Sequence, residues 1–179
     1  AWMGRNSTYN IMMYSHDTYG LGHIRRTMAI AAHLLGPRIN ILILTGSPIA
    51  GRFSFPEQID FVRIPGMIKK TNDEYLPLSI KINARHALDI RKNIITATAK
   101  TFQPHLFIVD KEPLGLKKEV LPTLQWLRRC RPGWEIHALV TSQAAPLVEN
   151  DPAIDAFYCW DGGDDEDLDW AKDLPEDEA

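Results

Sequence analysis

Residues 10–35 read Asn10-Ile-Met-Met-Tyr-Ser-His-Asp-Thr-Tyr-Gly-Leu-Gly-His-Ile-Arg-Arg-Thr-Met-Ala-Ile-Ala-Ala-His-Leu-Leu35. An apolar run from Ile11 to Tyr14 ends at a polar loop with two glycines, and a pattern of helical period follows. The apolar positions of that pattern are Ile24, Met28, Ala31, Ala32 and Leu35. A strand, a glycine-bearing turn and a helix in this order form the first half of a βαβ unit, in which the helix N-terminus offers amides to an anionic ligand.

Short apolar runs and helical patterns alternate along the rest of the chain. The predicted strands are 11–14, 39–44, 60–64, 106–109, 136–141 and 156–159. The predicted helices are 23–35, 78–102, 116–129 (interrupted or started late at Pro122) and 144–149. This alternation predicts an α/β fold, a Rossmann-like parallel sheet with helices on both faces. We expect one domain over residues 1–161 and an acidic, mobile tail over 162–179, where few apolar anchors occur.

Composition narrows the classes of function. The formal net charge is −3, and residues 161–178 carry most of the acidic excess, so the preceding body is mildly basic. We see no basic stripe with interleaved aromatics and therefore expect no nucleic-acid partner. No apolar run approaches the roughly 20 residues that span a bilayer, and no secretory signal is recognised. Cys130 and Cys159 lack CxxC spacing, which favours reduced thiols and a cytoplasmic location.

Polar residues follow three of the predicted strands at their carboxyl ends, where ligands bind in open α/β sheets. These are Ser15, His16, Asp17, Gly20, Gly22 and His23 after the first strand, Thr45, Gly46 and Ser47 after the second, and Asp110, Lys111 and Glu112 after the strand that ends at residue 109. If the fold is as predicted, the three loops converge at one edge of the sheet.

His23 is the candidate general base. A helix N-terminus disfavours a positive charge on the imidazole, and a neutral imidazole is what a general base requires. Asp110 would then fix the ring and stabilise its charged form. Alternatively, His23 is a polar residue that begins a helix, and we interpret His16 as a loop residue. Arg25 and Arg26 oppose the helix dipole, which an anionic ligand would explain, although both could equally extend into solvent.

Two blocks resemble a known family. Tyr14-Ser-His-Asp-Thr-Tyr-Gly-Leu-Gly-His-Ile-Arg-Arg-Thr-Met-Ala-Ile-Ala31 resembles the opening of a GT-B glycosyltransferase, most closely the bacterial predicted glycosyltransferases related to the MurG-like family. Leu106-Phe-Ile-Val-Asp-Lys-Glu-Pro-Leu-Gly-Leu116, with Glu119-Val-Leu-Pro-Thr-Leu124, is similar to a second block of that group. Residues 131–161 are more similar to heptosyltransferase-type enzymes, which are also GT-B.

The resemblance implies a single GT-B N-terminal half that binds the acceptor. Gly22-His23 matches the step that carries the catalytic base, and Asp110 falls where its partner aspartate stands. Gly20 and Gly22 would face phosphates. Substrate-binding roles are expected for Arg25, Arg26 and Lys111. A nucleotide-diphosphate sugar would be the donor substrate, and no cofactor and no metal are expected.

The same resemblance implies partners. The donor site of a GT-B enzyme lies largely in a second Rossmann domain, which we expect in cis or as a partner chain, so the chain would be a fragment or subunit of a glycosyltransferase and inactive alone. The acceptor could bring peripheral membrane association. The alternative is a non-catalytic nucleotide- or phosphate-binding module. A Rossmann oxidoreductase ranks third, because Arg25 stands where the third glycine of GxGxxG belongs.

Overall fold

The computed structural model describes residues 8–17, 22–70, 74–159 and 161. The chain divides into two compact units, 1–126 and 127–179, which we describe separately. The first holds β1 (Tyr9–Ser15), α1 (Gly22–Leu34), β2 (Ile39–Thr45), β3 (Ile59–Arg63), β4 (Met67–Lys69), β5 (Tyr75–Pro77), α2 (Ala84–Phe102), β6 (Leu106–Val109) and the start of α3 (Leu121–Cys130). The second holds the end of α3, β7 (His137–Val140) and β8 (Ala156–Cys159).

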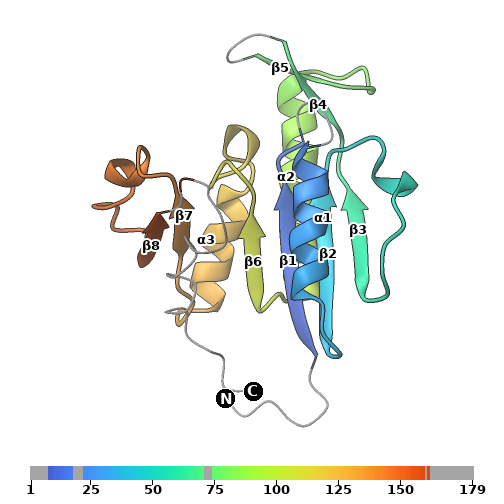
Figure 1. The fold of residues 1–179 in the computed structure, drawn as a ribbon. Coiled ribbons are helices and arrows are strands. Elements are labelled where there is room, and N and C mark those ends of the chain that lie inside the picture. Colours follow the sequence, from blue (N-terminus) through green and yellow to red (C-terminus); the bar gives the residue numbers. More distant parts are fainter. Residues whose placement is uncertain (1–7, 18–21, 71–73, 160, 162–179) are drawn as a thin grey trace. The chain divides into compact units, whose positions relative to one another are not determined.

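The centre of the first unit is a parallel sheet of four strands in the order β3-β2-β1-β6 (Figure 1). Ser15 is in register with Thr45 of β2, and Tyr14 with Val109 of β6. The carboxyl ends of these three strands therefore lie at one edge of the sheet. The predicted Rossmann-like α/β fold is confirmed.

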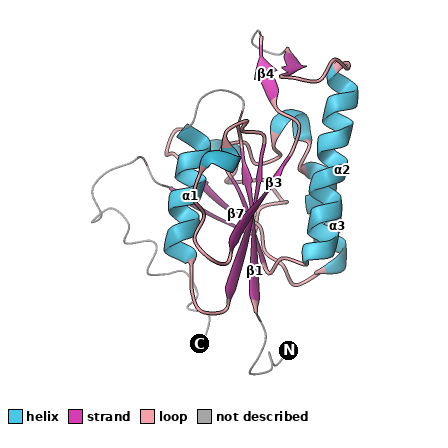
Figure 2. Cartoon of the chain, turned by 90° about the vertical axis from the view of Figure 1, so that its right-hand side faces the viewer, coloured by secondary structure: helices cyan, strands magenta, loops and turns pink. Residues whose placement is uncertain are grey.

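Helices cover both faces of this sheet, as Figure 2 shows with α1 on one side and α2 on the other, where the start of α3 also packs. Side chains of a strand alternate between faces. Ile11 and Met13 accordingly pack in one apolar cluster with α1. Met12 and Tyr14 pack in another, with α2 and the start of α3. This double coverage explains why β1 is apolar at successive positions instead of at every second one.

The structure corrects the predicted segment 78–102. Its helix, α2, begins at Ala84, because Asn83 caps it by accepting a hydrogen bond from the His86 amide at 2.8 Å. Upstream, β4 and β5 form an antiparallel pair in a stretch for which the sequence predicted no strand. Each of these strands has three residues, which is too short for a periodic pattern.

Residues 116–129 also differ from one continuous helix. Leu116–Lys118 forms a 3₁₀ turn, and α3 starts only at Leu121. Pro122 lies in the first turn of α3, where its missing N–H interrupts no helical hydrogen bond. The late start at Pro122 is thus the correct one of the two predicted possibilities.

In the second unit, β7 and β8 form a parallel pair, with His137 in register with Ala156. The predicted helix at 144–149 is a 3₁₀ turn, Ala145–Leu147. Among the described residues, no apolar side chain after Leu127 is buried. No helix in the described parts of the chain is long and apolar enough to cross a membrane.

Candidate functional site

The sheet brings His23 and Asp110 together. His23 is the second residue of α1, and Asp110 directly follows β6, where its amide donates to the Tyr14 carbonyl at 3.0 Å. The Nδ1 atom of His23 lies 2.7 Å from Oδ2 of Asp110. Their side chains are 20% and 15% exposed, so both atoms are largely shielded from water while the ring can still be reached. The contact expected from the sequence is present.

The partner of Nδ1 assigns the tautomer. A carboxylate only accepts hydrogen bonds, so the contact with Asp110 places a hydrogen on Nδ1, and in the neutral tautomer Nε2 then carries the lone pair. Arg26 Nη2 donates to the other Asp110 oxygen at 2.5 Å and lies 3.0 Å from His23 Nδ1. Arg26 therefore binds Asp110 directly, whereas the sequence predicted only a role in substrate binding.

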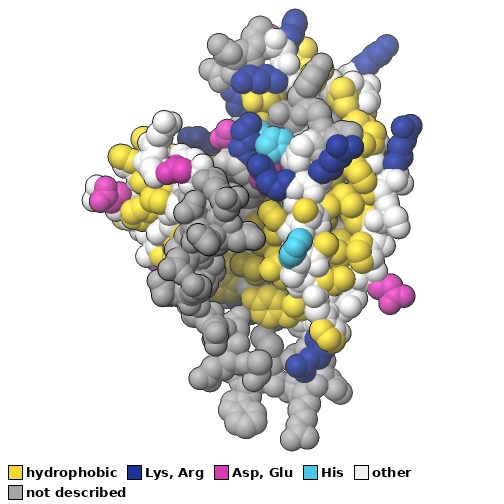
Figure 3. Space-filling model, in the orientation of Figure 1, with side chains coloured by type: hydrophobic (Ala, Val, Ile, Leu, Met, Phe, Trp, Pro, Cys, Tyr) yellow, Lys and Arg dark blue, Asp and Glu magenta, His cyan; other side chains and the backbone are white. Residues whose placement is uncertain are grey.

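Of the other predicted site residues, the described ones are near neighbours of His23 or Asp110 in the chain. Arg25 is exposed and makes no hydrogen bond or ion pair with the described residues. Lys111 is exposed and has a positive φ of 66°. Gly22 begins α1, and Gly20 lies outside the described residues. Figure 3 shows Lys and Arg side chains gathered near the N-terminal end of α1, beside a histidine. This edge of the sheet is therefore the basic side of the candidate site.

His16 is buried next to the pair. Only 4% of the residue is exposed, and its ring packs edge-on against that of His23, with centroids 6.0 Å apart. Burial lowers the pKa of His16, Glu112 opposes this shift, and Lys111 adds to it. Burial therefore favours the neutral form of the His16 ring. His16 lies in the loop after β1, as the sequence indicated, but its burial beside His23 was not anticipated.

A short chain of hydrogen bonds links the ends of β1 and β2. The Ser47 amide donates to Thr45 Oγ1 at 3.0 Å, and the Thr45 hydroxyl donates to Asp17 Oδ2. Four buried side-chain atoms here have no hydrogen-bond partner among the described residues: Ser15 Oγ, His16 Nδ1, Asp17 Oδ1 and Ser47 Oγ. Leaving such a group unpaired costs about 1–3 kcal/mol. Four unpartnered polar atoms at one edge of the sheet indicate that this edge can form further polar contacts.

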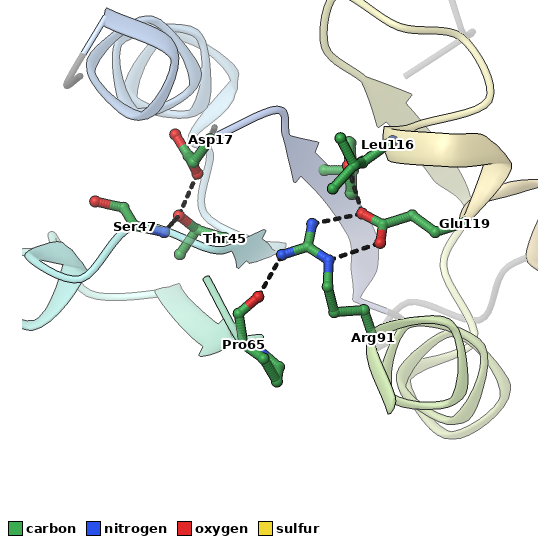
Figure 4. A network of polar contacts seen from close by, with 8 residues as sticks. Asp17, Thr45, Ser47, Pro65, Arg91, Leu116 and Glu119 are labelled. Carbon is green, nitrogen blue, oxygen red and sulfur yellow. Dashed lines mark hydrogen bonds and ion pairs between the residues drawn. The ribbon is translucent and has the colours of Figure 1, made fainter. Parts of the chain in front are cut away.

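A buried ion pair lies close to this edge (Figure 4). Arg91 donates through Nε and Nη2 to Glu119 at 2.6 and 2.5 Å, and through Nη1 to the Pro65 carbonyl at 2.5 Å. Tyr14 donates its hydroxyl hydrogen to Glu119 at 2.6 Å. Burial and the Glu119 carboxylate raise the pKa of Tyr14 far above its usual value. Burial opposes the charge on Arg91, but its bonds to Glu119 outweigh burial and raise the pKa of the guanidinium.

The sequence of α2 carries one signal for this network. Along α2 the buried positions are Ala87, Arg91, Ile95 and Ala99. They are spaced by four residues and form one stripe. A charged residue inside an apolar stripe requires a buried partner. The identity of that partner, Glu119, depends on a contact 28 residues away.

Within the described residues no group of three or more His, Cys, Asp or Glu side chains is arranged to hold a metal ion. No protein-family model, curated protein or solved structure matches the chain.

Proposed function

We propose that this chain is the acceptor-side half of a cytoplasmic GT-B glycosyltransferase, which moves a sugar from a nucleotide-diphosphate sugar to a hydroxyl acceptor. The observation that carries the proposal is the His23–Asp110 contact at the carboxyl edge of a Rossmann-like sheet. The resemblance of residues 10–129 to GT-B enzymes supports it. A histidine held by a carboxylate, with Nε2 free, is an arrangement suited to a general base.

In the proposed reaction, Nε2 of His23 takes the proton from the acceptor hydroxyl as its oxygen attacks the anomeric carbon of the donor. The new glycosidic C–O bond forms while the bond from that carbon to the diphosphate breaks, and the diphosphate leaves with the electron pair. Asp110 stabilises the imidazolium that results, and Arg26 holds the second oxygen of Asp110 in place. Arg25, Lys111 and the amides at the start of α1 would offset charge on phosphate groups.

The donor would be bound mainly by a second Rossmann domain, supplied in cis or by a partner chain. On this proposal the chain alone transfers no sugar, needs no cofactor, and could associate peripherally with a membrane through its acceptor.

The test requires the assembled enzyme with both Rossmann halves. His23→Ala should lower kcat by about 10²–10⁴-fold, the usual contribution of a positioned base, with little change in substrate affinity. Asp110→Asn should cause a smaller loss, because the ring loses only its charged partner. His33→Ala is the matched control, since His33 is exposed on the same helix and contacts only the Ala29 carbonyl among the described residues. A His23→Ala enzyme with the wild-type kcat would refute the catalytic role.

One observation favours the alternative, a nucleotide- or phosphate-binding module without catalysis. The first turn of α1 reads Gly22-His-Ile-Arg25 and contains no acidic side chain, which suits an anion at its N-terminus. Titration of the chain with a nucleoside diphosphate separates the two. If the chain is such a module, it should bind the nucleoside diphosphate, and Arg25→Ala should weaken that binding. His23→Ala should then reduce no turnover.

A further inference from the structure

Asp17 is fixed as a hydrogen-bond acceptor by its neighbours. Thr45 Oγ1 accepts from the Ser47 amide and therefore turns its own hydrogen toward Asp17 Oδ2. Asp17 Oδ1 keeps its lone pairs, in a residue that is 7% exposed. Figure 4 shows this oxygen and the Ser47 hydroxyl both directed away from Thr45.

The remaining unpartnered atoms lie on the same two strand ends. Ser15 and Ser47 are 0% and 2% exposed, and each hydroxyl can donate and accept. The backbone turns tightly there, since the Asp17 amide donates to the Ser15 carbonyl at 2.9 Å. His16, whose ring contacts that of His23, places the cluster beside the proposed base. The cluster thus offers one carboxylate acceptor, two hydroxyls and one ring nitrogen.

This set of groups discriminates between ligands. An alcohol donates its hydrogen to a carboxylate and accepts from a serine hydroxyl, so each ligand hydroxyl would satisfy two of these atoms. A phosphate dianion is repelled by the charge of Asp17, and its unprotonated oxygens have no hydrogen to give to that carboxylate. The chemistry is therefore that of hydroxyl recognition, although the neighbouring face with Arg25 is basic.

We propose that Ser15, Asp17 and Ser47, together with His16, form a subsite for the hydroxyl groups of a neutral polyhydroxyl ligand such as a pyranose. The assignment of this ligand as the acceptor rests on the function proposed above: the subsite would hold neighbouring hydroxyls while His23 deprotonates the reacting one. Acceptors with a single hydroxyl would then be poor substrates.

The proposal can be tested on the 179-residue chain without any donor. The ¹⁵N-labelled protein is titrated with methyl α-glucopyranoside, methyl α-galactopyranoside and methyl α-mannopyranoside, and separately with tetrahydropyran and inorganic phosphate. At least one pyranoside should shift the amides of 15–17 and 45–47 in a saturable way. Tetrahydropyran, which has the ring without hydroxyls, and phosphate should leave these amides unchanged.

Variants make the test specific. Asp17→Asn keeps the shape and removes the charged acceptor, so it should weaken pyranoside binding by about 10- to 100-fold, the effect of losing one hydrogen bond to a charged group. Ser47→Ala should weaken it by about 3- to 10-fold and provides a second variant if Asp17→Asn does not fold. Asp60→Asn, at an exposed position of the same sheet, is the matched control and should leave binding unchanged.

The outcomes separate this proposal from the catalytic one. The subsite is refuted if no pyranoside shifts these amides, if phosphate shifts them, or if folded Asp17→Asn and Ser47→Ala bind as the wild type does. Pyranoside binding combined with full turnover in His23→Ala would retain the subsite and reject the base. If His23→Ala loses turnover but the chain binds no pyranoside, the catalytic base would be retained and the subsite rejected.

Discussion

Arg91 is the largest of the fully buried side chains among the described residues. Two of its hydrogen bonds go to the Glu119 carboxylate and one goes to the Pro65 carbonyl. Such an ion pair contributes little net stability compared with an apolar pair of equal size, because both charges must be desolvated. Removing one partner is far more harmful, since the other charge stays buried alone.

We therefore predict that Arg91→Met lowers the free energy of unfolding by about 3–5 kcal/mol, while the double variant Arg91→Met/Glu119→Leu recovers much of that loss. Urea denaturation of the wild type, both single variants and the double variant measures this as a double-mutant cycle. If the loss of stability in the double variant equalled the sum of the losses in the two single variants, the two charges would not depend on each other.

His16 gives a prediction about pH. Burial lowers its pKa in the folded state, and the charged groups that act on it are Glu112, Lys111, His23 and Glu119. Below about pH 6.5 the unfolded chain binds a proton at His16 more readily than the folded chain does. Stability attributable to a neutral His16 is therefore fully present above that pH and is lost as the pH falls.

The stability advantage of the wild type over His16→Asn should accordingly shrink between about pH 7.5 and pH 5. Urea midpoints across this range measure the difference, and His33→Asn, at an exposed position, controls for removal of a histidine. A difference that is constant with pH would mean that His16 does not titrate differently on folding.

At the level of elements, α2 depends on the residue that caps its N-terminus. Asn83 supplies the only side-chain cap described for this helix, through its bond to the His86 amide. Asn83→Ala should lower the free energy of unfolding by about 1 kcal/mol, whereas Asn83→Ser should nearly preserve it, because serine caps equally well. Thermal and urea unfolding of both variants would decide this, and equal losses would indicate a role for Asn83 other than capping.

The turn between β6 and α3 depends on Gly115. Its φ is +69° with ψ at −177°, a conformation open essentially to glycine alone. A Cβ there would lie 2.4 Å from Val120 Cγ2. Gly115→Ala should therefore destabilise the fold by about 1–3 kcal/mol from backbone strain, with a further loss from the clash. Gly133→Ala is the control, because no atom lies within 4 Å of its Cβ position; equal stabilities would contradict the argument.

The elements differ in how far the sequence determined them. β1 and β2 were predictable because each is a nearly continuous apolar run, and α1 because its apolar residues recur at helical spacing. The approach of His23 and Asp110 was predictable because both follow carboxyl ends of parallel strands. The β4–β5 pair and the Arg91–Glu119 network were not predictable in this way. Short strands have no period, and the choice of a buried partner depends on packing between segments far apart in the chain.

For the molecule as a whole, the two units should differ in local stability. The described part of the second unit has no buried apolar side chain after Leu127, and Leu139 and Leu147 are 55% and 81% exposed. Within this unit, Asp155 accepts a hydrogen bond from the Ile136 amide at 2.7 Å and forms an ion pair with Arg128 at 3.1 Å. Few buried contacts mean a low free energy of local opening.

Hydrogen exchange should therefore be faster in β7 and β8 than in β1 and β2. Asp155→Ala should accelerate exchange further within 136–159 and leave the parallel sheet of the first unit unchanged. The hydrogen bond from the Ile136 amide, which outweighs desolvation and is aided by Arg128, lowers the pKa of Asp155. Protonation of this carboxyl in acid should therefore cause the same loss of protection in the wild type, measured relative to the intrinsic exchange rate at each pH. Uniform acceleration throughout the chain would indicate one cooperative unit.

The position of β1 between β2 and β6 has a consequence for the order of events during synthesis. A ribosome delivers β1, α1 and β2 before β6, and these neighbours along the chain can pair as soon as they emerge. His23 must wait for Asp110, 87 residues later, and Tyr14 for Glu119, 105 residues later. Contacts so distant in sequence form slowly and leave apolar surface exposed meanwhile. Until β6 arrives, one edge of β1 is unpaired, and the nascent chain is most open to aggregation during that interval.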